Sequence, residues 1–274
     1  MTGAERIAAA FEAARGEGRA ALMPYLMGGF PDAETSRAVI EAYADAGADL
    51  IELGVPFSDP LADGPVIHAA ATKALAAGST FDAVLEVGRA ATEGVPVIPM
   101  VYANMVLARG AEAYAQALSD AGMAGTIIPD LPPEEAEEVR EALGAAGLAL
   151  IPLIAPTTPA ARRAEICRTA TGFIYVVSDT RTTGERDRMP EELGDLVRSV
   201  QADADVPAAV GFGIGTPEQA AEVGAVADGV IIGSRLVREV AEAADADAAA
   251  RAVGEFIRAT RAAMSERGVE SRVR

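Results

Sequence analysis

The feature that most constrains the fold of this chain is a unit that recurs eight times: a short apolar run, a polar loop and an Ala-rich amphipathic segment. None of the runs alternates apolar with polar residues as a half-solvated strand does, so each is expected to be buried on both faces in a parallel sheet covered by helices. The eight runs are residues 20–28, 48–55, 95–102, 125–130, 148–155, 172–178, 206–213 and 227–234.

Eight crossovers of one hand close most simply into a barrel. The sequence therefore predicts an α/β protein, a single (β/α)8 TIM barrel with an extra N-terminal helix over residues 5–15. An open doubly wound sheet is the alternative, but a G-x-G-x-x-G turn after the first run is missing. One domain is expected over residues 1–274, with the barrel over 20–267 and a frayed tail over 268–274.

Helix ends are marked as well. Thr216 before Pro217 predicts an N-cap, and Gln219 is placed to complete a capping box with Thr216. Thr158 before Pro159 predicts another N-cap. Left-handed residues that end helices are expected at Gly47, Gly122 and Gly147.

Composition excludes several classes of function. The chain has 23 Lys and Arg against 41 Asp and Glu, a net charge of −18, which disfavours binding to nucleic acid or to an anionic membrane. Cys167 and His68 are the only residues of their types, so neither an internal disulfide nor a His-based metal cage is expected. No apolar run approaches the length of about 20 residues that spans a bilayer. We expect a cytoplasmic protein that binds no metal.

Catalytic groups of such barrels lie at the carboxyl ends of the strands. Glu52 stands there between Ile51 and Leu53, in a strand that is otherwise apolar, and a carboxylate in that setting is costly unless it is paired or functional. Burial raises the pKa of a carboxyl group, which suits a proton shuttle near neutral pH. The alternative is a structural carboxylate bonded to backbone or to a lysine.

Asp63 follows on the loop FSDPLADGP, residues 57–65. Taken alone it could be the N-cap of the helix that Gly64-Pro65 opens. Because it lies only a short loop beyond Glu52, on the same rim, it is also a candidate partner. Two carboxyl groups in different environments can divide acid–base and electrostatic roles.

The last two apolar runs end in GFGIGT and IIGS. Glycines there allow backbone N–H groups to approach an anion, and each turn leads into a helix whose N-terminus favours negative charge. With Gly184 from the loop after the sixth run, they predict a phosphate site, although glycines also simply form tight turns. The charged segment 178–192, which includes Thr183, is either a lid over the substrate or an ordinary solvated loop.

Residues 51–64, IELGVPFSDPLADG, resemble the signature segment of the tryptophan synthase α subunit family. Further segments agree in order along nearly the whole chain. They are PYLMGGFPD (24–32), PMVYANMV (99–106), IIPDLP (127–132), TTG (182–184), GFGIGTPEQ (211–219) and IIGS (231–234).

The resemblance implies a lyase that releases indole and glyceraldehyde 3-phosphate from indole-3-glycerol phosphate by retro-aldol cleavage. It implies no cofactor on this chain, and a partner β subunit that carries pyridoxal phosphate in an α2β2 complex. It also implies that Glu52 is the general acid–base, that Asp63 orients indole and that Tyr175 is the family's tyrosine of strand six. The phosphate ligands that it implies are Gly184, Gly213, Gly233 and Ser234. It places Tyr102, Asn104 and Asp130 near the indole pocket or the partner contact.

An apolar pocket for indole is expected from Leu22, Met100 and Ile127, together with Tyr102. The chain departs from the usual family pattern at Arg181 and Thr182 in loop six, and at Met27 and Phe30 near the first strand. Neither departure affects the two carboxylates.

Three other interpretations remain open. The chain could be another phosphosugar barrel enzyme, such as an isomerase or epimerase. It could be a non-catalytic partner that only activates a β subunit. It could also be a lyase that acts alone and releases free indole.

Overall fold

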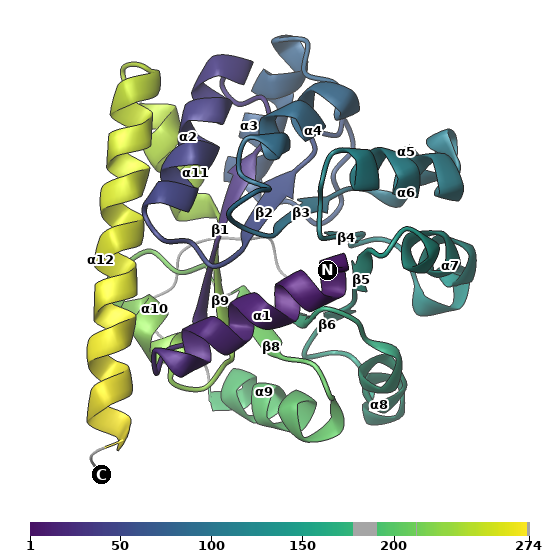
Figure 1. Cartoon of the computed structure of the whole chain (residues 1–274), viewed down its shortest axis with the longest axis vertical. Coiled ribbons are helices and arrows are strands. Elements are labelled where there is room, and N and C mark those ends of the chain that lie inside the picture. Colours follow the sequence, from purple (N-terminus) through teal and green to yellow (C-terminus); the bar gives the residue numbers. More distant parts are fainter. Residues whose placement is uncertain (178–190, 212, 273–274) are drawn as a thin grey trace.

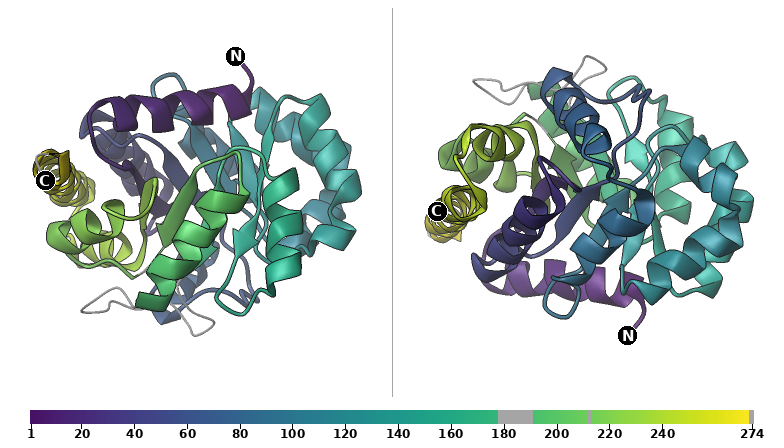
Figure 2. Two further views of the ribbon diagram at one scale, coloured as in Figure 1. Left: turned by 90° about the horizontal axis from the view of Figure 1, so that it is seen from below. Right: turned by 90° about the horizontal axis from the view of Figure 1, so that it is seen from above.

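The computed structural model describes residues 1–177, 191–211 and 213–272, with side chains described up to residue 266 (Figure 1). Within these residues, nine parallel strands form one sheet in the order β5-β4-β3-β2-β1-β9-β8-β7-β6, which curls into a nearly closed barrel (Figure 2). The strands are β1 (Ala21–Met27), β2 (Ile51–Gly54), β3 (Val97–Met100), β4 (Gly125–Ile127), β5 (Ala149–Ile151), β6 (Leu153–Ile154), β7 (Ile174–Val177), β8 (Ala208–Gly211) and β9 (Gly229–Ile232).

Helices surround the strands and connect them. They are α1 (Gly3–Gly16), α2 (Ala33–Asp45), α3 (Pro65–Ala76), α4 (Phe81–Arg89), α5 (Ala103–Arg109), α6 (Ala111–Asp120), the 3-10 turn η1 (Pro133–Glu135), α7 (Glu137–Ala145), α8 (Ala160–Thr169), α9 (Glu191–Asp203), α10 (Pro217–Gly224), α11 (Ser234–Glu242) and α12 (Ala246–Arg272). The predicted TIM-barrel fold is confirmed.

All eight apolar runs form strands, and the fifth is divided in two. β5 pairs with β4 and β6 pairs with β7, with Pro152 between them. Proline has no N–H to give to a strand ladder, so the regular pairing is interrupted at this residue. The carbonyl of Pro152 still accepts a hydrogen bond of 2.9 Å from the N–H of Tyr175. The barrel thus closes through one strand with a break in its middle.

Helix α1 seals the end of the barrel where the strands begin, and it crosses in front of the ring of strands in Figure 1. Its buried Ile7 and Phe11 belong to the apolar cluster inside the barrel. Arg6 fixes the helix by donating hydrogen bonds to the carbonyls of Gly122, at 2.9 Å, and Thr92, at 2.6 Å. Because the apolar face of α1 closes the core at this end, an active site is expected at the opposite end of the barrel, where the strands end.

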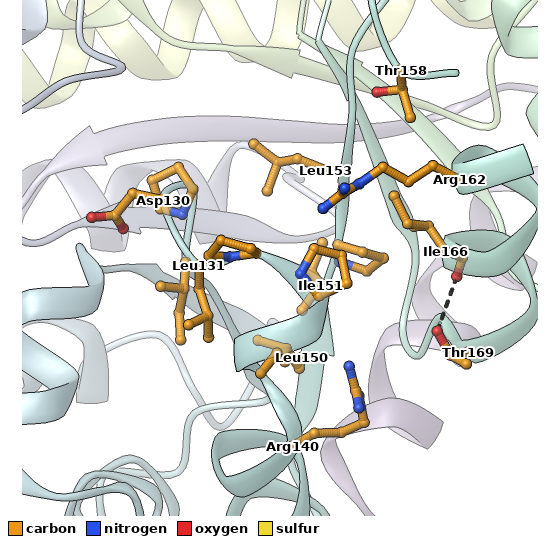
Figure 3. A pocket seen from close by; sticks show the side chains of 16 residues that line it. Asp130, Leu131, Arg140, Leu150, Ile151, Leu153, Thr158, Arg162, Ile166 and Thr169 are labelled. Carbon is orange, nitrogen blue, oxygen red and sulfur yellow. Dashed lines mark hydrogen bonds between the residues drawn. The ribbon is translucent and has the colours of Figure 1, made fainter. Parts of the chain in front are cut away.

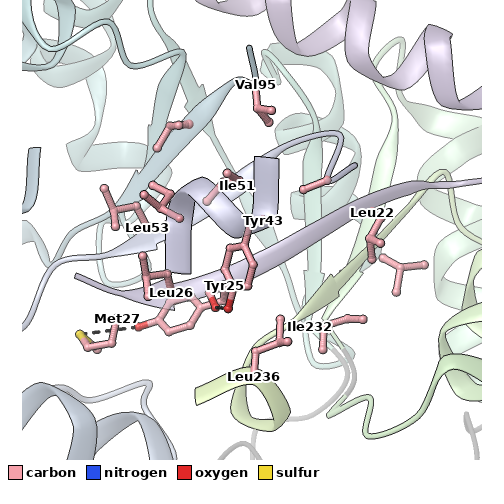
Figure 4. Packing of buried hydrophobic residues seen from close by; sticks show 14 of the residues in the cluster. Leu22, Tyr25, Leu26, Met27, Tyr43, Ile51, Leu53, Val95, Ile232 and Leu236 are labelled. Atoms are coloured by element: carbon pink, nitrogen blue, oxygen red, sulfur yellow. Dashed lines mark hydrogen bonds between the residues drawn. The ribbon is translucent and has the colours of Figure 1, made fainter. Parts of the chain in front are cut away.

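Most strand residues alternate between two apolar clusters; Tyr25, which belongs to the outer cluster although it pairs in register with Glu52, is an exception. Ala21 and Met23 belong to the inner cluster, which fills the barrel. Leu22 and Leu26 belong to the outer cluster, between strands and helices (Figure 4). Successive side chains of a strand point to opposite faces, so this alternation shows which residues of each strand look into the barrel.

Most predicted helix ends agree with the structure. The capping box of Thr216 and Gln219 is present, and the φ angles of Gly47, Gly122 and Gly147 are +91°, +74° and +72°, as expected for left-handed residues that end helices. The predicted N-cap at Thr158 is wrong. Pro159 occupies the N-cap of α8, because the Thr158 hydroxyl accepts a hydrogen bond from the N–H of Ala155 instead.

Helix α12 lies along one side of the molecule beside α2 and α10 (Figure 1). It continues to Arg272, through the segment for which fraying was expected. The domain boundaries themselves stay a prediction. Across the described residues, no helix combines the length and the apolar character needed to cross a membrane.

Candidate active site

Glu52 lies inside the barrel as the second of the four residues of β2. It pairs in register with Tyr25 on β1 and Ile98 on β3, and it is only 1% exposed. Its Oε2 atom is buried and has no hydrogen-bond partner in the described structure. Burial, with a smaller contribution from the negative charge of Asp63, raises the pKa of Glu52 from 4.5 to about 8. At neutral pH this side chain is therefore a protonated acid that can give its proton away.

Asp63 approaches from the loop that follows β2. Its Oδ1 accepts a hydrogen bond of 3.1 Å from the hydroxyl of Tyr102. Burial raises the pKa of Asp63, while this hydrogen bond and the charge of His68 act in the opposite direction. The alternative role as an N-cap is wrong, because Gly64 occupies the N-cap of α3 and no side chain caps that position.

Tyr102 holds the loop that carries Asp63. Besides its bond to the carboxylate, its hydroxyl accepts a hydrogen bond of 3.1 Å from the N–H of Ala62. Its ring stacks on Phe57 with the ring centres 5.2 Å apart. Tyr102 is 3% exposed, and its pKa is raised mainly by burial. Three contacts from one side chain therefore fix the position of the second carboxylate.

The buried Tyr25 and the partly buried Tyr175 complete the polar lining. Tyr175 on β7 was predicted as a site residue, whereas Tyr25, the register partner of Glu52, was missed. The Tyr25 and Tyr175 hydroxyls lie so close to Gly54 and Gly211, respectively, that neither glycine leaves room for a side chain. Burial first, and then the charges of the two carboxylates, raise the pKa of both tyrosines. Both phenols are thus neutral groups near Glu52.

The apolar part of the site comes from neighbouring strands. Met100 and Ile127 are register partners, and both pack in the inner cluster, as expected for walls of the barrel cavity. Leu22 belongs to the outer cluster, so its assignment to the indole pocket is wrong. A shift of one residue along a strand moves a side chain to the other face.

The helices after β8 and β9 differ in their N-termini. In α10 the side chain of Gln219 accepts hydrogen bonds from the N–H groups of Gly215, at 2.7 Å, and Thr216, at 3.2 Å. Helix α11 begins at the buried Ser234 after Gly233, and no side chain caps it. Since a helix N-terminus attracts anions, α11 offers the more open of the two ends.

Gly213 has a φ of +64°, a left-handed conformation that favours glycine. It follows β8, as Gly233 follows β9, so both predicted phosphate glycines stand at the carboxyl ends of neighbouring strands. Gly184 and Thr183 lie outside the described residues, as do Arg181 and Thr182.

Comparison with known proteins agrees with this geometry. A family model described as tryptophan synthase alpha chain matches residues 11–265. The chain is similar to the tryptophan synthase alpha chain of Prochlorococcus marinus, 46% identical over 241 residues that cover 87% of this chain and 88% of the relative. It is also similar to that of Carboxydothermus hydrogenoformans, 48% identical over 234 residues that cover 85% and 88%.

Solved structures give the same result. The chain resembles Mycobacterium tuberculosis tryptophan synthase with a TM-score of 0.87 at 36% identity, over 94% of this chain and 98% of that chain. It resembles the tryptophan synthase alpha subunit of Legionella pneumophila str. Paris with a TM-score of 0.87 at 37% identity, over 97% and 99%.

This chain belongs to the tryptophan synthase alpha chain family.

Membership of the tryptophan synthase alpha chain family identifies the reaction that the chain catalyses. It is the lyase component that cleaves indole-3-glycerol phosphate in tryptophan biosynthesis. The isomerase, the epimerase and the purely activating partner are therefore set aside. Among the described residues, no group of three or more His, Cys, Asp and Glu side chains could hold a metal ion.

The two residues expected near the partner contact of this alpha chain lie together on the rim. The carboxylate of Asp130 accepts a hydrogen bond of 2.7 Å from the N–H of Ala103 at the start of α5, and Asn104 is the next residue. Both are exposed. Two large apolar side chains are also exposed on this side of the chain, Leu107 on α5 at 68% and Leu61 on the Asp63 loop at 85%.

Proposed function

We propose that Glu52 is the general acid and base of indole-3-glycerol phosphate cleavage. A neutral Glu52 gives its proton to C3 of the indole ring, which turns the ring into a cationic leaving group. The resulting carboxylate takes the proton of the glycerol hydroxyl as the C–C bond breaks, and the bonding electrons return to the ring. Indole and glyceraldehyde 3-phosphate are released, and Glu52 is again protonated.

The observation that carries this proposal is the buried Oε2 of Glu52 without a hydrogen-bond partner. A structural carboxyl group would be expected to have its hydrogen bonds satisfied by the protein. A raised pKa of about 8 also keeps the proton available at neutral pH. Both properties fit an acid whose partner is the substrate.

Asp63 is proposed to stabilise the charge that develops on the ring. Its carboxylate would accept a hydrogen bond from the indole N–H, and this bond strengthens as the protonated ring becomes cationic. The hydrogen bonds of Tyr102 to the Asp63 loop support this electrostatic role of Asp63. A charge that is held in place before the reaction needs no reorganisation during it. Tyr175, Met100 and Ile127 are proposed to line the indole pocket.

The substrate phosphate is proposed to bind at the N-terminus of α11. The absence of a side-chain cap on this helix and the buried Ser234 at its first position support this placement. Gly213 and Gly233 would let backbone N–H groups approach the phosphate oxygens. Gly184 would contribute from the loop after β7, and Thr183 would belong to a lid that closes over the substrate.

A pyridoxal-phosphate-bearing β subunit is the proposed partner, in an α2β2 complex. Asn104 and Asp130 would contact it, and the exposed Leu61 and Leu107 supply apolar surface near them. Because Leu61 is on the same loop as Asp63, docking of the partner would also restrict the loop that carries a catalytic group. Comparing cleavage rates with and without the β subunit separates this arrangement from a lyase that acts alone.

The Glu52→Gln variant tests the catalytic assignment. Turnover of indole-3-glycerol phosphate, followed through glyceraldehyde 3-phosphate, is expected to fall by about 10²–10⁴-fold, since glutamine cannot transfer the proton. Binding of the β subunit should remain, because Glu52 is buried inside the barrel. Turnover within about twofold of wild type would reject the role of Glu52.

A further inference from the structure

A cavity lies at the broken fifth strand. Its volume is about 350 Å³, within the usual range for small-molecule sites. The loop after β4 forms one wall, residues 150–153 form the floor, and α7 and α8 form the sides (Figure 3). Neither carboxylate of the active site is among its lining residues.

The break in the strand explains why this space exists. β4 pairs with β5 up to the level of Ile127 and Ile151, and from Leu153 onward the strand pairs only with β7 among the described residues. The chain after β4 therefore leaves the sheet instead of continuing beside β6. Pro129, Pro132 and Pro152 line the cavity; their rings fix φ, so its walls are stiff.

Most polar side chains of the lining are already committed to the backbone. Asp130 accepts from the N–H of Ala103, and its carboxylate points away from the cavity (Figure 3). Thr158 accepts from the N–H of Ala155, and the Thr169 hydroxyl donates to carbonyls of its own helix. Each of these three groups is therefore held in place by a hydrogen bond to the backbone.

The remaining polar lining is cationic. The side chains of Arg140, from α7, and Arg162, from α8, extend into the cavity from two sides in Figure 3. Arg162 is held by an ion pair of 2.7 Å with Glu134, which occupies only one of its nitrogen atoms. The half-buried Arg140 forms no ion pair with another described residue. Between the two guanidinium groups the floor is apolar, with Leu150 and Leu153.

We propose that this cavity binds a small organic anion with an apolar body, such as an arylalkanoate. Its carboxylate would pair with the guanidinium group of Arg140, because guanidinium groups recognise carboxylates through paired N–H donors. Its apolar body would rest on the leucines of the floor. A bare inorganic anion would leave that apolar floor uncovered, and a neutral ligand of the same shape would supply no charge to pair with Arg140.

Binding of 3-phenylpropionate to the full-length chain tests the proposal. The measurement is a titration followed by the methyl NMR signals of Leu131, Leu150 and Leu153, with 3-phenylpropan-1-ol as the neutral analogue and inorganic phosphate as the bare anion. We expect saturable shifts of these methyl groups with the carboxylate, and binding weaker by about tenfold or more for the two comparison ligands.

The Arg140→Met variant should also bind the carboxylate about tenfold more weakly, since it keeps the apolar stem and loses the charge. Arg162→Met should have a smaller effect, because Arg162 already pairs with Glu134. Arg198→Met is the matched control: Arg198 lies on α9, does not line the cavity and pairs with Asp195 on its own helix, so binding should stay as in wild type. Equal affinity for the alcohol, unchanged binding in Arg140→Met, or no saturable shift at the three leucines would each overturn the proposal.

Discussion

The hydroxyl of Tyr102 donates a hydrogen bond to Oδ1 of Asp63, and thereby joins the end of β3 to the loop that follows β2. The same oxygen accepts from the N–H of Ala62, so it spans the loop at two successive residues. The second carboxylate of the site is thus positioned by a side chain from the connection between β3 and α5.

Replacing Tyr102 with phenylalanine should reveal this function. The variant keeps the stack on Phe57 and loses both hydrogen bonds, so kcat/KM is expected to fall by about tenfold as the Asp63 loop gains freedom. Steady-state cleavage kinetics measures the effect. Tyr114→Phe is the control, since it removes another buried phenol, one bonded to Thr126, far from the carboxylates. If both variants lost stability alike and neither lost activity, the hydrogen bond would be merely structural.

The raised pKa of Glu52 predicts that stability depends on pH. The folded chain binds this proton up to about pH 8, whereas an unfolded chain releases it near 4.5. The stabilisation is therefore complete below the unfolded pKa and is lost as pH rises through the folded pKa.

Glu52→Gln has no such proton to lose. Relative to wild type, its free energy of unfolding should rise from about pH 5 to about pH 9 by a few kcal/mol, since each unit of pKa shift corresponds to about 1.4 kcal/mol. Urea unfolding at the two pH values measures the difference. A constant gap between the two proteins would mean that Glu52 is ionised in the folded state.

Asp63→Asn should affect catalysis through charge. The kcat is expected to fall by about 10²-fold or more, with substrate affinity changed far less, because the carboxylate matters most when the ring becomes cationic. The negative charge of Asp63 also raises the pKa of Glu52, so its removal should shift the alkaline limb of the kcat/KM profile to lower pH.

The control for that variant is Asp59→Asn, measured on the isolated chain. Asp59 is exposed on the same loop, and its carboxylate accepts a hydrogen bond from Ser58. Its profile should match that of wild type. Comparable losses of kcat and of binding in Asp63→Asn would point to a structural role instead.

The sequence predicted the barrel well because its signals are local. Each apolar run is bounded by turns and helices, and Glu52 is conspicuous as a charge within such a run. The capping box at Thr216 and the left-handed glycines are equally local. All of these features could be recognised without knowing which strands are neighbours.

What the sequence could not supply depends on register. Strands that are apolar on both faces carry no alternation, so nothing indicated that Leu22 faces the helices and that Tyr25 faces Glu52. A tyrosine in a core strand is also an ordinary packing residue, and only its pairing with Glu52 places it in the site. Similarly, Pro152 could not be identified as the residue that separates β5 from β6 before the pairing partners of these two strands were known.

Ser234→Ala tests the phosphate site. The KM for indole-3-glycerol phosphate should rise by about tenfold while kcat changes little, because the lost hydrogen bond is made to phosphate both before and during the reaction. Inorganic phosphate should also become a weaker inhibitor. Thr216→Ala is the matched control at the other helix N-terminus. It should lose about 1 kcal/mol of stability through its missing cap and keep its KM. If KM rose only in the Thr216→Ala control, the phosphate site would be assigned to the N-terminus of α10 instead.

Gly211→Ala probes how closely the active-site tyrosines pack. A Cβ at this position would meet the hydroxyl of Tyr175, with ring atoms at 2.9 and 3.0 Å behind it, so the variant should lose about 1–3 kcal/mol of stability. Adding Tyr175→Phe removes the nearest atom. The double variant should therefore recover part of the loss, with a coupling free energy of about 0.5–3 kcal/mol measured by urea unfolding.

The control is Gly144→Ala in α7, where a Cβ would meet no atom within 4 Å. Alanine should stabilise this helix by about 0.5–1 kcal/mol, since it has the higher helix propensity. The opposite signs at the two glycines follow from space alone, because neither has a positive φ. If the losses of stability from Gly211→Ala and Tyr175→Phe were simply additive, contact with the Tyr175 hydroxyl would not be the reason that glycine is required at position 211.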